Sequence, residues 1–255
     1  MSCGRSDTMR AVEHLLRATA RAEARHFWFR GFRAFVTPFL RYATAGRSNP
    51  RLVDCGCGTG TNLALLGRFG RAYGFDLSPT GVAIGRGAGR RLARASVTAV
   101  PFASASFDVA ASFDVLYSLE DADERIALDE MYRILKPGGF AIINVAAMEA
   151  LRGDHSVLSQ EVRRYSRRTI GERLVRAGFT IVRLTYTNFT LLPPLLLARA
   201  WQRRRGLRAT QHEIAVPSEP LNALFTGLLV LESIWVRWFD APAGSSLLCL
   251  ARKPT

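Results

Sequence analysis

From residue 52 onward, short apolar runs alternate with stretches in which apolar residues recur at helical spacing. Strands are expected at 52–54, 73–76, 96–100, a run ending near Ser112, 140–145, 180–186 and 246–252. Helices are expected at 61–69, from Ser78 and Pro79 to about Ala95, at 123–135 and at 169–177. The alternation predicts an α/β fold around a mainly parallel sheet with right-handed crossovers.

The residues before the first strand predict a helical segment, 1–48, rich in aromatic side chains. Residues 11–25 favour a helix, which leads into His26-Phe27-Trp28-Phe29-Arg30 and continues with phenylalanines at helical spacing. Two interpretations stay open: a helix packed on the sheet, or a cap that closes over a ligand.

A second unusual segment, 187–244, separates the last two strands of a central domain made of 49–186 and 245–255. Insertions of this length are usually functional. It holds two apolar stretches, 191–208 and 221–239, but Pro193-Pro194 breaks the first and the second contains Glu232 and Arg237, so neither predicts a membrane span. Apolar residues beside arginines and tryptophans fit helices on a membrane surface, whereas burial on the main domain or a second subunit fits the pattern equally.

Composition changes this picture only in part. The 255 residues suffice for one large α/β domain, and the net charge of +14 could serve nucleic acid, anionic lipid or a phosphorylated substrate, or could simply coat solvated helices. Four cysteines give no disulfide framework, and Cys55 and Cys57 are too close and isolated for a zinc site, so we expect no metal. The first residues lack a long apolar run, which favours a cytoplasmic location.

The chemistry concentrates in Val53 to Gly60, VDCGCGTG, where an apolar run breaks into a glycine-rich loop. Gly56, Gly58 and Gly60 can adopt positive φ and bring backbone N–H groups close to a ligand. Asp54 ends the first strand, and Asp76 ends the second, where a carboxylate can bind ribose hydroxyls. These features predict a nucleotide-like cofactor at the carboxyl ends of the strands.

Together with Val100-Pro101-Phe102, Ser106-Phe107-Asp108 and the turn Leu135-Lys136-Pro137-Gly138-Gly139, this loop resembles the class I S-adenosylmethionine-dependent methyltransferases of the type 11 family. The resemblance implies a Rossmann-like seven-stranded sheet with order 3-2-1-4-5-7-6 and an antiparallel last strand. It also implies S-adenosylmethionine as cofactor. The residues expected to bind it are Asp54, Gly56, Cys57, Gly58, Gly60, Asp76, Leu77, Thr98, Ala99, Val100 and Phe113.

The chain departs from the family pattern at two places. Ser96 stands where many relatives have an acid at the end of strand three, and Tyr117-Ser118 stand where the family often has Glu-His. The general base is therefore sought elsewhere, and the candidates are His155, Asp114 and Tyr165.

The acceptor is expected to be a small-molecule, glycan or lipid-linked compound methylated at oxygen or nitrogen. The aromatic start and the segment 154–166 resemble a subgroup of bacterial type 11 enzymes. The residues expected to bind the acceptor are Phe27, Trp28, Arg30, Tyr117, Arg163 and Arg164.

Alternative functions are a nicotinamide-dependent oxidoreductase on a Rossmann fold and a non-enzymatic, membrane-associated protein that binds S-adenosylmethionine. The G-x-G-x-G spacing disfavours the first. Nucleic acid is not expected as a partner, because residues 112–114 lack the element that receives a flipped base. Peripheral membrane contact through 191–239 and a homodimer are the partner interactions considered.

Overall fold

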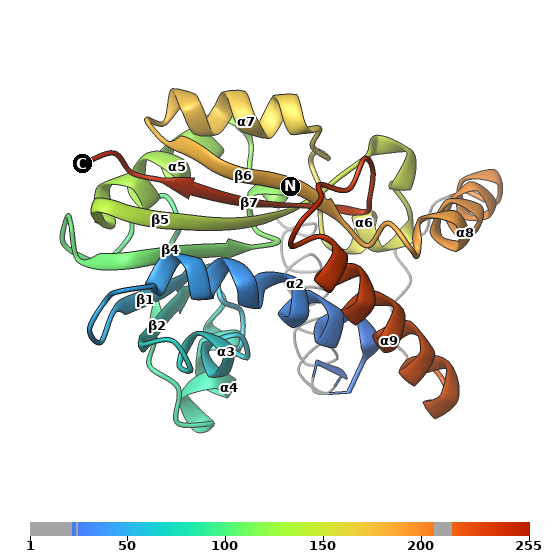
Figure 1. Cartoon of the computed structure of the whole chain (residues 1–255), viewed down its shortest axis with the longest axis horizontal. Coiled ribbons are helices and arrows are strands. Elements are labelled where there is room, and N and C mark those ends of the chain that lie inside the picture. Colours follow the sequence, from blue (N-terminus) through green and yellow to red (C-terminus); the bar gives the residue numbers. More distant parts are fainter. Residues whose placement is uncertain (1–21, 24, 207–215) are drawn as a thin grey trace, which may run out of the picture.

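The computed structural model describes residues 22–23, 25–206 and 216–255. Its strands are β1 (Arg51–Cys55), β2 (Arg71–Asp76), β3 (Leu92–Arg94), β4 (Phe107–Phe113), β5 (Leu135–Ala146), β6 (Thr180–Thr187) and β7 (Ser246–Arg252). They form one seven-stranded sheet with order β3-β2-β1-β4-β5-β7-β6, in which β7 runs antiparallel to both neighbours (Figure 1). The predicted strand order and the antiparallel last strand are confirmed.

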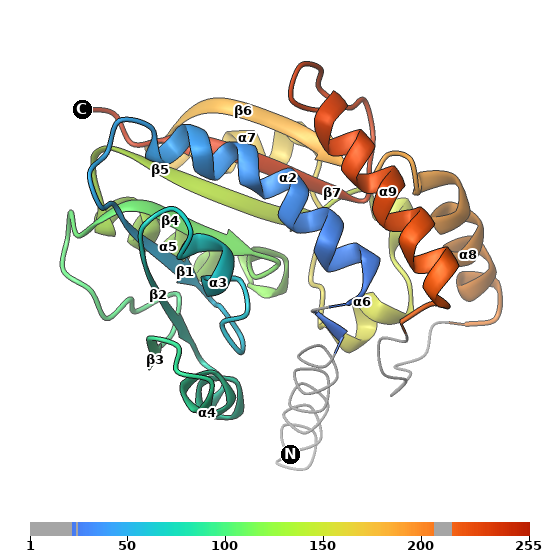
Figure 2. The ribbon, with the colours of Figure 1, turned by 60° about the horizontal axis from the view of Figure 1, so that its bottom comes forward.

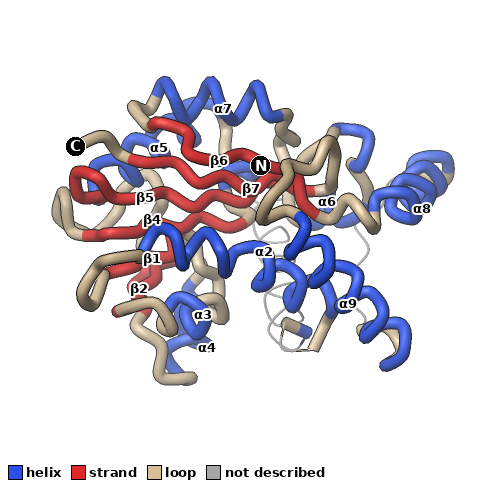
Figure 3. Tube along the Cα trace, viewed as in Figure 1, coloured by secondary structure: helices blue, strands red, loops and turns tan. Residues whose placement is uncertain are grey.

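Helices cover both faces of this sheet (Figure 3). They are α2 (Phe27–Thr44), α3 (Leu63–Leu66), α4 (Pro79–Gly87), α5 (Asp121–Ile134), α6 (Asp154–Leu158), α7 (Arg167–Arg176), α8 (Leu192–Arg204) and α9 (Glu219–Trp235). Along β4, Phe107 and Ala110 point into one core cluster with α5 and α7, whereas Val109 and Ala111 point into another with α2, α3 and α4. Both faces are therefore dry, as expected for a mainly parallel sheet.

The third strand lies elsewhere than predicted. It spans Leu92–Arg94, and the predicted strand 96–100 is a turn closed by a single bridge between Ser96 and Ala99. The Ser96 hydroxyl accepts a hydrogen bond from the Thr98 backbone N–H at 3.1 Å, a local bond that competes with strand pairing. The preceding helix begins as predicted, with Ser78 as N-cap, but ends at Gly87 because the chain turns at Gly89 with φ of +74°.

The N-terminal aromatic segment contacts both the sheet and a cavity. Most of the helix predicted at 11–25 lies outside the described residues, and α2 begins at Phe27. Its later turns bury Phe35, Val36 and Phe39 against the sheet, whereas Trp28 and Phe32, near its start, line a cavity. The later turns therefore pack on the sheet, as the first interpretation predicts, whereas closure of the helix over a ligand stays a prediction.

The segment between β6 and β7 forms α8 and α9, which lie together at one end of the molecule (Figures 1 and 2). Helix α9 crosses α2, and Asn222 Oδ1 accepts a hydrogen bond from the Phe27 N–H at 2.8 Å. In the part of the chain that the structure describes, no helix combines the length and apolarity that crossing a bilayer requires.

Candidate functional site

The loop after β1 has the backbone that its glycines predict. Gly56, Gly58 and Gly60 have φ of +81°, +56° and +76°. The N–H groups of Gly56 and Cys57 donate to the Phe75 carbonyl at 2.9 and 3.0 Å, which fastens the loop to the end of β2. At Gly56 an added Cβ would lie 2.6 Å from Val115 Cγ2, so a side chain is excluded there by space as well as by conformation.

Asp54, at the end of β1, is a buried carboxylate without a partner. It is 1% exposed, and neither of its oxygens has a hydrogen-bond partner among the described residues. Burial, with the nearby charges of Asp76 and Glu23, raises the pKa of Asp54 to about 8. An unsatisfied buried carboxylate is costly, and it is found where a ligand supplies the missing donors.

Asp76, at the end of β2, holds the loop in place. Its Oδ2 accepts the Gly58 N–H at 2.7 Å, and its Oδ1 accepts the Ser78 N–H at 2.8 Å. Two backbone donors fix this carboxylate and leave further lone pairs for hydroxyl groups.

A cavity of about 500 Å³ opens beside this loop. Asp54, Gly56, Cys57 and Gly58 form part of its wall. The start of α2 adds His26, Trp28, Phe29 and Phe32, and other parts of the wall come from Asp114, Tyr117, His155, Glu161, Arg164, Leu195 and Arg199. A volume of this size suits small molecules, and this wall combines apolar surface with a few charged groups.

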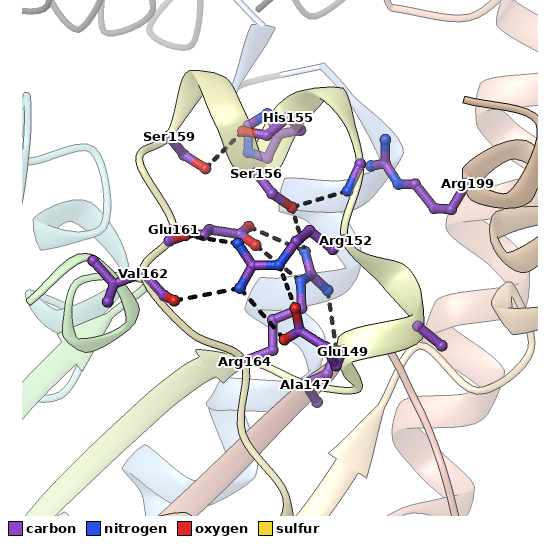
Figure 4. A network of polar contacts seen from close by, with 12 residues as sticks. Ala147, Glu149, Arg152, His155, Ser156, Ser159, Glu161, Val162, Arg164 and Arg199 are labelled. Carbon is purple, nitrogen blue, oxygen red and sulfur yellow. Dashed lines mark hydrogen bonds and ion pairs between the residues drawn. The ribbon is translucent and has the colours of Figure 1, made fainter. Parts of the chain in front are cut away.

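The polar part of the wall is a connected network around α6 (Figure 4). Arg164 donates to both oxygens of Glu161, at 2.9 and 3.0 Å, and also to the Ala147 carbonyl at 3.0 Å. The side chains of this pair are only 7% and 2% exposed. Because its charges are mutually neutralised and hydrogen-bonded, the pair forms a rigid edge of the cavity.

Asp114 follows β4 in a strained backbone conformation, with φ of +60°. Asn144 Nδ2 donates to its Oδ1 at 2.9 Å. Asp114 lines the cavity and its side chain is exposed there. The protein atoms around the carboxylate desolvate it in part and raise the pKa of Asp114 to about 7, although the Asn144 bond opposes the shift. Asp54 of β1 pairs in register with Ala111 of β4. Asp114 follows the end of β4, so it lies next to the glycine-rich loop that follows β1, which we call the cofactor loop.

His155, on α6, also faces the cavity. Its side chain is exposed, and partial desolvation by the neighbouring protein lowers the pKa of His155; the Glu161 carboxylate opposes this effect, and Arg199 and Arg164 reinforce it. The imidazole is therefore neutral at neutral pH and is able to accept a proton.

The structure brings together some of the predicted residues and not others. Those that line the cavity are Asp54, Gly56, Cys57, Gly58, Phe113, Asp114, Tyr117, His155, Trp28 and Arg164. Those outside its lining are Gly60, Asp76, Leu77, Thr98, Ala99, Val100, Tyr165, Phe27, Arg30 and Arg163. Of the second group, Asp76 still contacts the loop directly through Gly58.

Tyr165, Arg163 and Arg30 have other contacts or surroundings than those expected. The Tyr165 hydroxyl donates to the Leu116 carbonyl at 3.2 Å in the core. Arg163 forms ion pairs with Asp121 and the buried Glu124, on the far side of the loop from Arg164. Arg30 is exposed to solvent. Tyr165 and Arg163 point away from the cavity because they flank Arg164 in an extended segment, where neighbouring side chains point in opposite directions.

Sequence reasoning missed several polar residues of the wall. Glu23 lines the cavity with a raised pKa caused mainly by burial. His26 caps α2, where its Nδ1 accepts the Trp28 N–H at 3.1 Å. Glu161 and Arg199 are separated in sequence and meet only through the fold. For His26 a signal existed, since a polar residue before a helical aromatic run is a candidate N-cap.

The residues present fit the expected cofactor. The two unpartnered oxygens of Asp54 can accept an ammonium group, the glycine loop gives close backbone approach, and Asp76 can accept ribose hydroxyls. Thr98 to Val100 lie on the turn after β3 rather than on a strand, and Val100 N–H is already bonded to Glu130 at 2.8 Å.

Comparisons with known proteins agree with this geometry. Residues 53–143 match a family model described as a methyltransferase domain. A tRNA (carboxymethyluridine(34)-5-O)-methyltransferase of Arabidopsis thaliana is 33% identical over 126 residues, which cover 49% of this chain and 30% of that protein. Malonyl-[acyl-carrier protein] O-methyltransferase 1 of Coxiella burnetii is 32% identical over 142 residues, covering 52% of this chain and 49% of that protein. The aligned regions thus span about half or less of these curated relatives.

Solved structures share the fold. An S-adenosylmethionine-dependent methyltransferase from Thermotoga maritima superposes with a TM-score of 0.60 at 18% identity, covering 96% of this chain and 99% of the other. The family match, the confirmed strand order and the fit of the loop to the cofactor lead to one conclusion. Residues 53–143 match the methyltransferase domain of the type 11 family, the sheet has the fold of the S-adenosylmethionine-dependent methyltransferases, and S-adenosylmethionine is the cofactor that the site fits.

Proposed function

We propose that this methyltransferase acts at an oxygen or nitrogen atom of a small acceptor, free or lipid-linked, that carries an acidic group. The observation that supports this is the shared cavity. Its wall contains the cofactor loop, a carboxylate with a raised pKa at Asp114 and the guanidinium of Arg199. One cavity can therefore hold the methyl donor and the acceptor together.

Positioning supplies much of the rate of methyl transfer, because the nucleophile must lie in line with the bond that breaks. The bound cofactor supplies an electrophilic methyl group on a sulfonium. Asp114 then orients the acceptor and takes its proton from a hydroxyl or an amine. With a pKa of about 7, Asp114 is ionised in a large fraction of molecules at neutral pH and is still basic enough to receive a proton.

Arg199 supports the acidic group on the acceptor. It is half-buried, its Nη1 donates to Gln202 Oε1 at 2.7 Å, and its other N–H donors have no partner among the described residues. Arg164, by contrast, is fully engaged by Glu161, Ala147 and Ser156. The names of the Arabidopsis and Coxiella relatives contain a carboxymethyl and a malonyl group, and each of these groups includes a carboxyl. Both names also specify methylation at oxygen, so they agree with an acidic acceptor.

The test is incubation of the protein with methyl-labelled S-adenosylmethionine and separate metabolite, lipid and tRNA fractions of the source cell. We expect label in one anionic small molecule or lipid. Label confined to tRNA, as the name of the Arabidopsis relative would suggest, would overturn the proposal. An Asp54→Asn variant serves as the control for cofactor-independent labelling, because it lacks the carboxylate that fits the cofactor.

A further inference from the structure

Helix α9 is oriented with its polar side inward. The residues that it buries are Asn222, Thr226, Leu229, Glu232 and Ser233, of which only Leu229 is apolar. A helix at the surface of a domain normally shows the reverse pattern, with its apolar stripe toward the core. Of the apolar side of α9, only Phe225 and Leu228 pack in part against the core, so its burial on the main domain holds for a small part of that side.

Hydrogen bonds hold α9 in this orientation. Asn222 accepts from the Phe27 N–H at 2.8 Å and donates to the Arg25 carbonyl at 2.9 Å. Glu232 accepts the N–H groups of Phe189 and Thr190 at 2.8 and 2.9 Å, and also the Thr190 hydroxyl at 2.7 Å. These buried polar groups are satisfied only in this rotation, because turning the helix would leave them unpaired.

The apolar side of α9 consequently faces outward. Leu224 is 57% exposed, Leu231 65% and Trp238, just after the helix, 79%. Helix α8 lies at the same end of the molecule, where Leu197 and Trp201 are also exposed (Figure 2). We call this surface the apolar face, and it consists of Leu197, Trp201, Leu221, Leu224, Leu231, Ile234, Trp235 and Trp238.

Arginines accompany the apolar face. Arg203 and Arg204 are exposed on the last turn of α8, and Arg237 is exposed between Trp235 and Trp238. The Arg203 guanidinium donates to the carbonyls of Ala150 and Arg152, so Arg204 and Arg237 are the arginines that can pair with headgroups. Helix α8 contains no acidic residue, and Glu232 of α9 is buried and hydrogen-bonded. The exposed acidic residues nearby are Glu219, at the start of α9, and Asp240, which pairs with Arg183. The three arginines outnumber them, so the charge beside the exposed apolar side chains is positive.

From this combination we infer that the apolar face lies on the surface of an anionic lipid bilayer. Leucines and tryptophans enter the boundary between headgroups and acyl chains, and arginines pair with anionic headgroups. A second copy of this chain is the alternative occupant that the experiment must separate from lipid. Contact of this face with lipid does not depend on the identity of the acceptor.

The experiment uses the full chain with vesicles of phosphatidylcholine alone or of phosphatidylcholine mixed with phosphatidylglycerol. We expect cosedimentation with the anionic vesicles, weakened by salt, and a blue shift of tryptophan emission, since three of the four tryptophans lie on the apolar face. Leu231→Glu combined with Trp238→Glu should lower partitioning by about tenfold or more. Arg204→Gln and Arg237→Gln should each lower it by about fivefold, the loss of one headgroup attraction.

Val175→Glu is the matched control, because Val175 is 59% exposed on α7 and lies outside the apolar face. It should leave vesicle binding unchanged, and thermal unfolding should verify that every variant is folded. Absence of binding to anionic vesicles by the folded protein would overturn the inference. So would a dimer in solution that Leu231→Glu converts to monomer without any effect on lipid binding.

Discussion

Gly31 of α2 lies directly beneath Leu229 of α9. A Cβ added to Gly31 would be 2.7 Å from Leu229 Cβ and 2.4 Å from its Cδ1. Leu229 is fully buried, so the two helices meet at a point where only hydrogen fits. This crossing joins the late insertion to the helix that supplies Trp28, Phe29 and Phe32 to the cavity wall.

Replacing Gly31 by alanine should therefore lower the free energy of unfolding by about 1 to 2 kcal/mol, because overpacking outweighs the helix propensity that alanine gains. Gly227→Ala is the matched control: this glycine lies in α9, and a methyl group added to it would have nothing within 4 Å among the described residues. It should raise stability by about 0.5 to 1 kcal/mol. Chemical denaturation measures both, and equal effects of the two substitutions would contradict the close crossing.

Asp54 should make the cofactor-free protein less stable as pH rises. Its carboxyl titrates near about 4 in an unfolded chain, and its folded pKa is about 8. Between these values the folded state binds more protons than the unfolded state, so stability falls with increasing pH. Asp54→Asn should remove this pH dependence of stability. It should stabilise the cofactor-free protein at pH 8 by roughly 1 to 3 kcal/mol. It should also weaken cofactor binding by about tenfold or more. Denaturation at several pH values and calorimetric titration measure these effects.

Asp108→Asn supplies the contrasting control. Burial alone would raise the pKa of Asp108, but the Arg51 N–H, Lys136 and Arg47 lower it below its ordinary value. This carboxyl stabilises the fold above its unfolded pKa and loses the effect as pH falls. Its replacement should destabilise the protein at pH 8 and leave cofactor binding intact. Stabilisation by both substitutions would show that the unpartnered state of Asp54 is not the cause.

The sequence could predict those features that depend on residues close together in the chain. Ser78, Pro79 and the glycines of the loop act through their own backbone, so the start of α4 and the loop conformation followed from them. The strand at 92–94 did not, because its three residues are selected by pairing with β2 and not by composition. The inward polar side of α9 was also unpredictable, since Asn222 and Glu232 find their partners 195 and 43 residues away.

The same distinction holds for the cavity. Asp54 could be identified because a strand end and a glycine loop adjoin it, whereas Glu23 and Arg199 lie in helical sequence without a motif. Tyr165 and Arg164 are neighbours in the chain, yet only Arg164 faces the cavity. Which of two adjacent side chains faces a site depends on how the extended segment packs, and this is set by distant groups such as Glu124 and Glu161.

Asp114 should determine the pH profile of the reaction. Because its ionised form receives the proton, the turnover rate should rise as pH increases through about 7. Asp114→Asn should remove this rise, the limb of the pH profile near pH 7, and should lower turnover by about 10²- to 10⁴-fold. His155→Gln distinguishes the two candidates, since the pKa of His155 lies below its ordinary value and its replacement should leave the limb near pH 7 in place. Persistence of the limb in Asp114→Asn would assign the proton transfer to another group.

Arg199 should govern acceptor affinity without affecting the cofactor. Arg199→Gln should raise KM for the labelled acceptor by about 10- to 100-fold, the value of a charge-assisted hydrogen bond, while S-adenosylmethionine binds as before. Arg176→Gln is the control, because Arg176 is exposed on α7 and lies outside both the cavity lining and the apolar face. A neutral analogue of the acceptor should bind the wild type more weakly than the acceptor does, and Arg199→Gln should not change the affinity for this analogue. Equal KM values in wild type and Arg199→Gln would show that the acidic group binds elsewhere, and would leave the assignment of the cofactor loop intact.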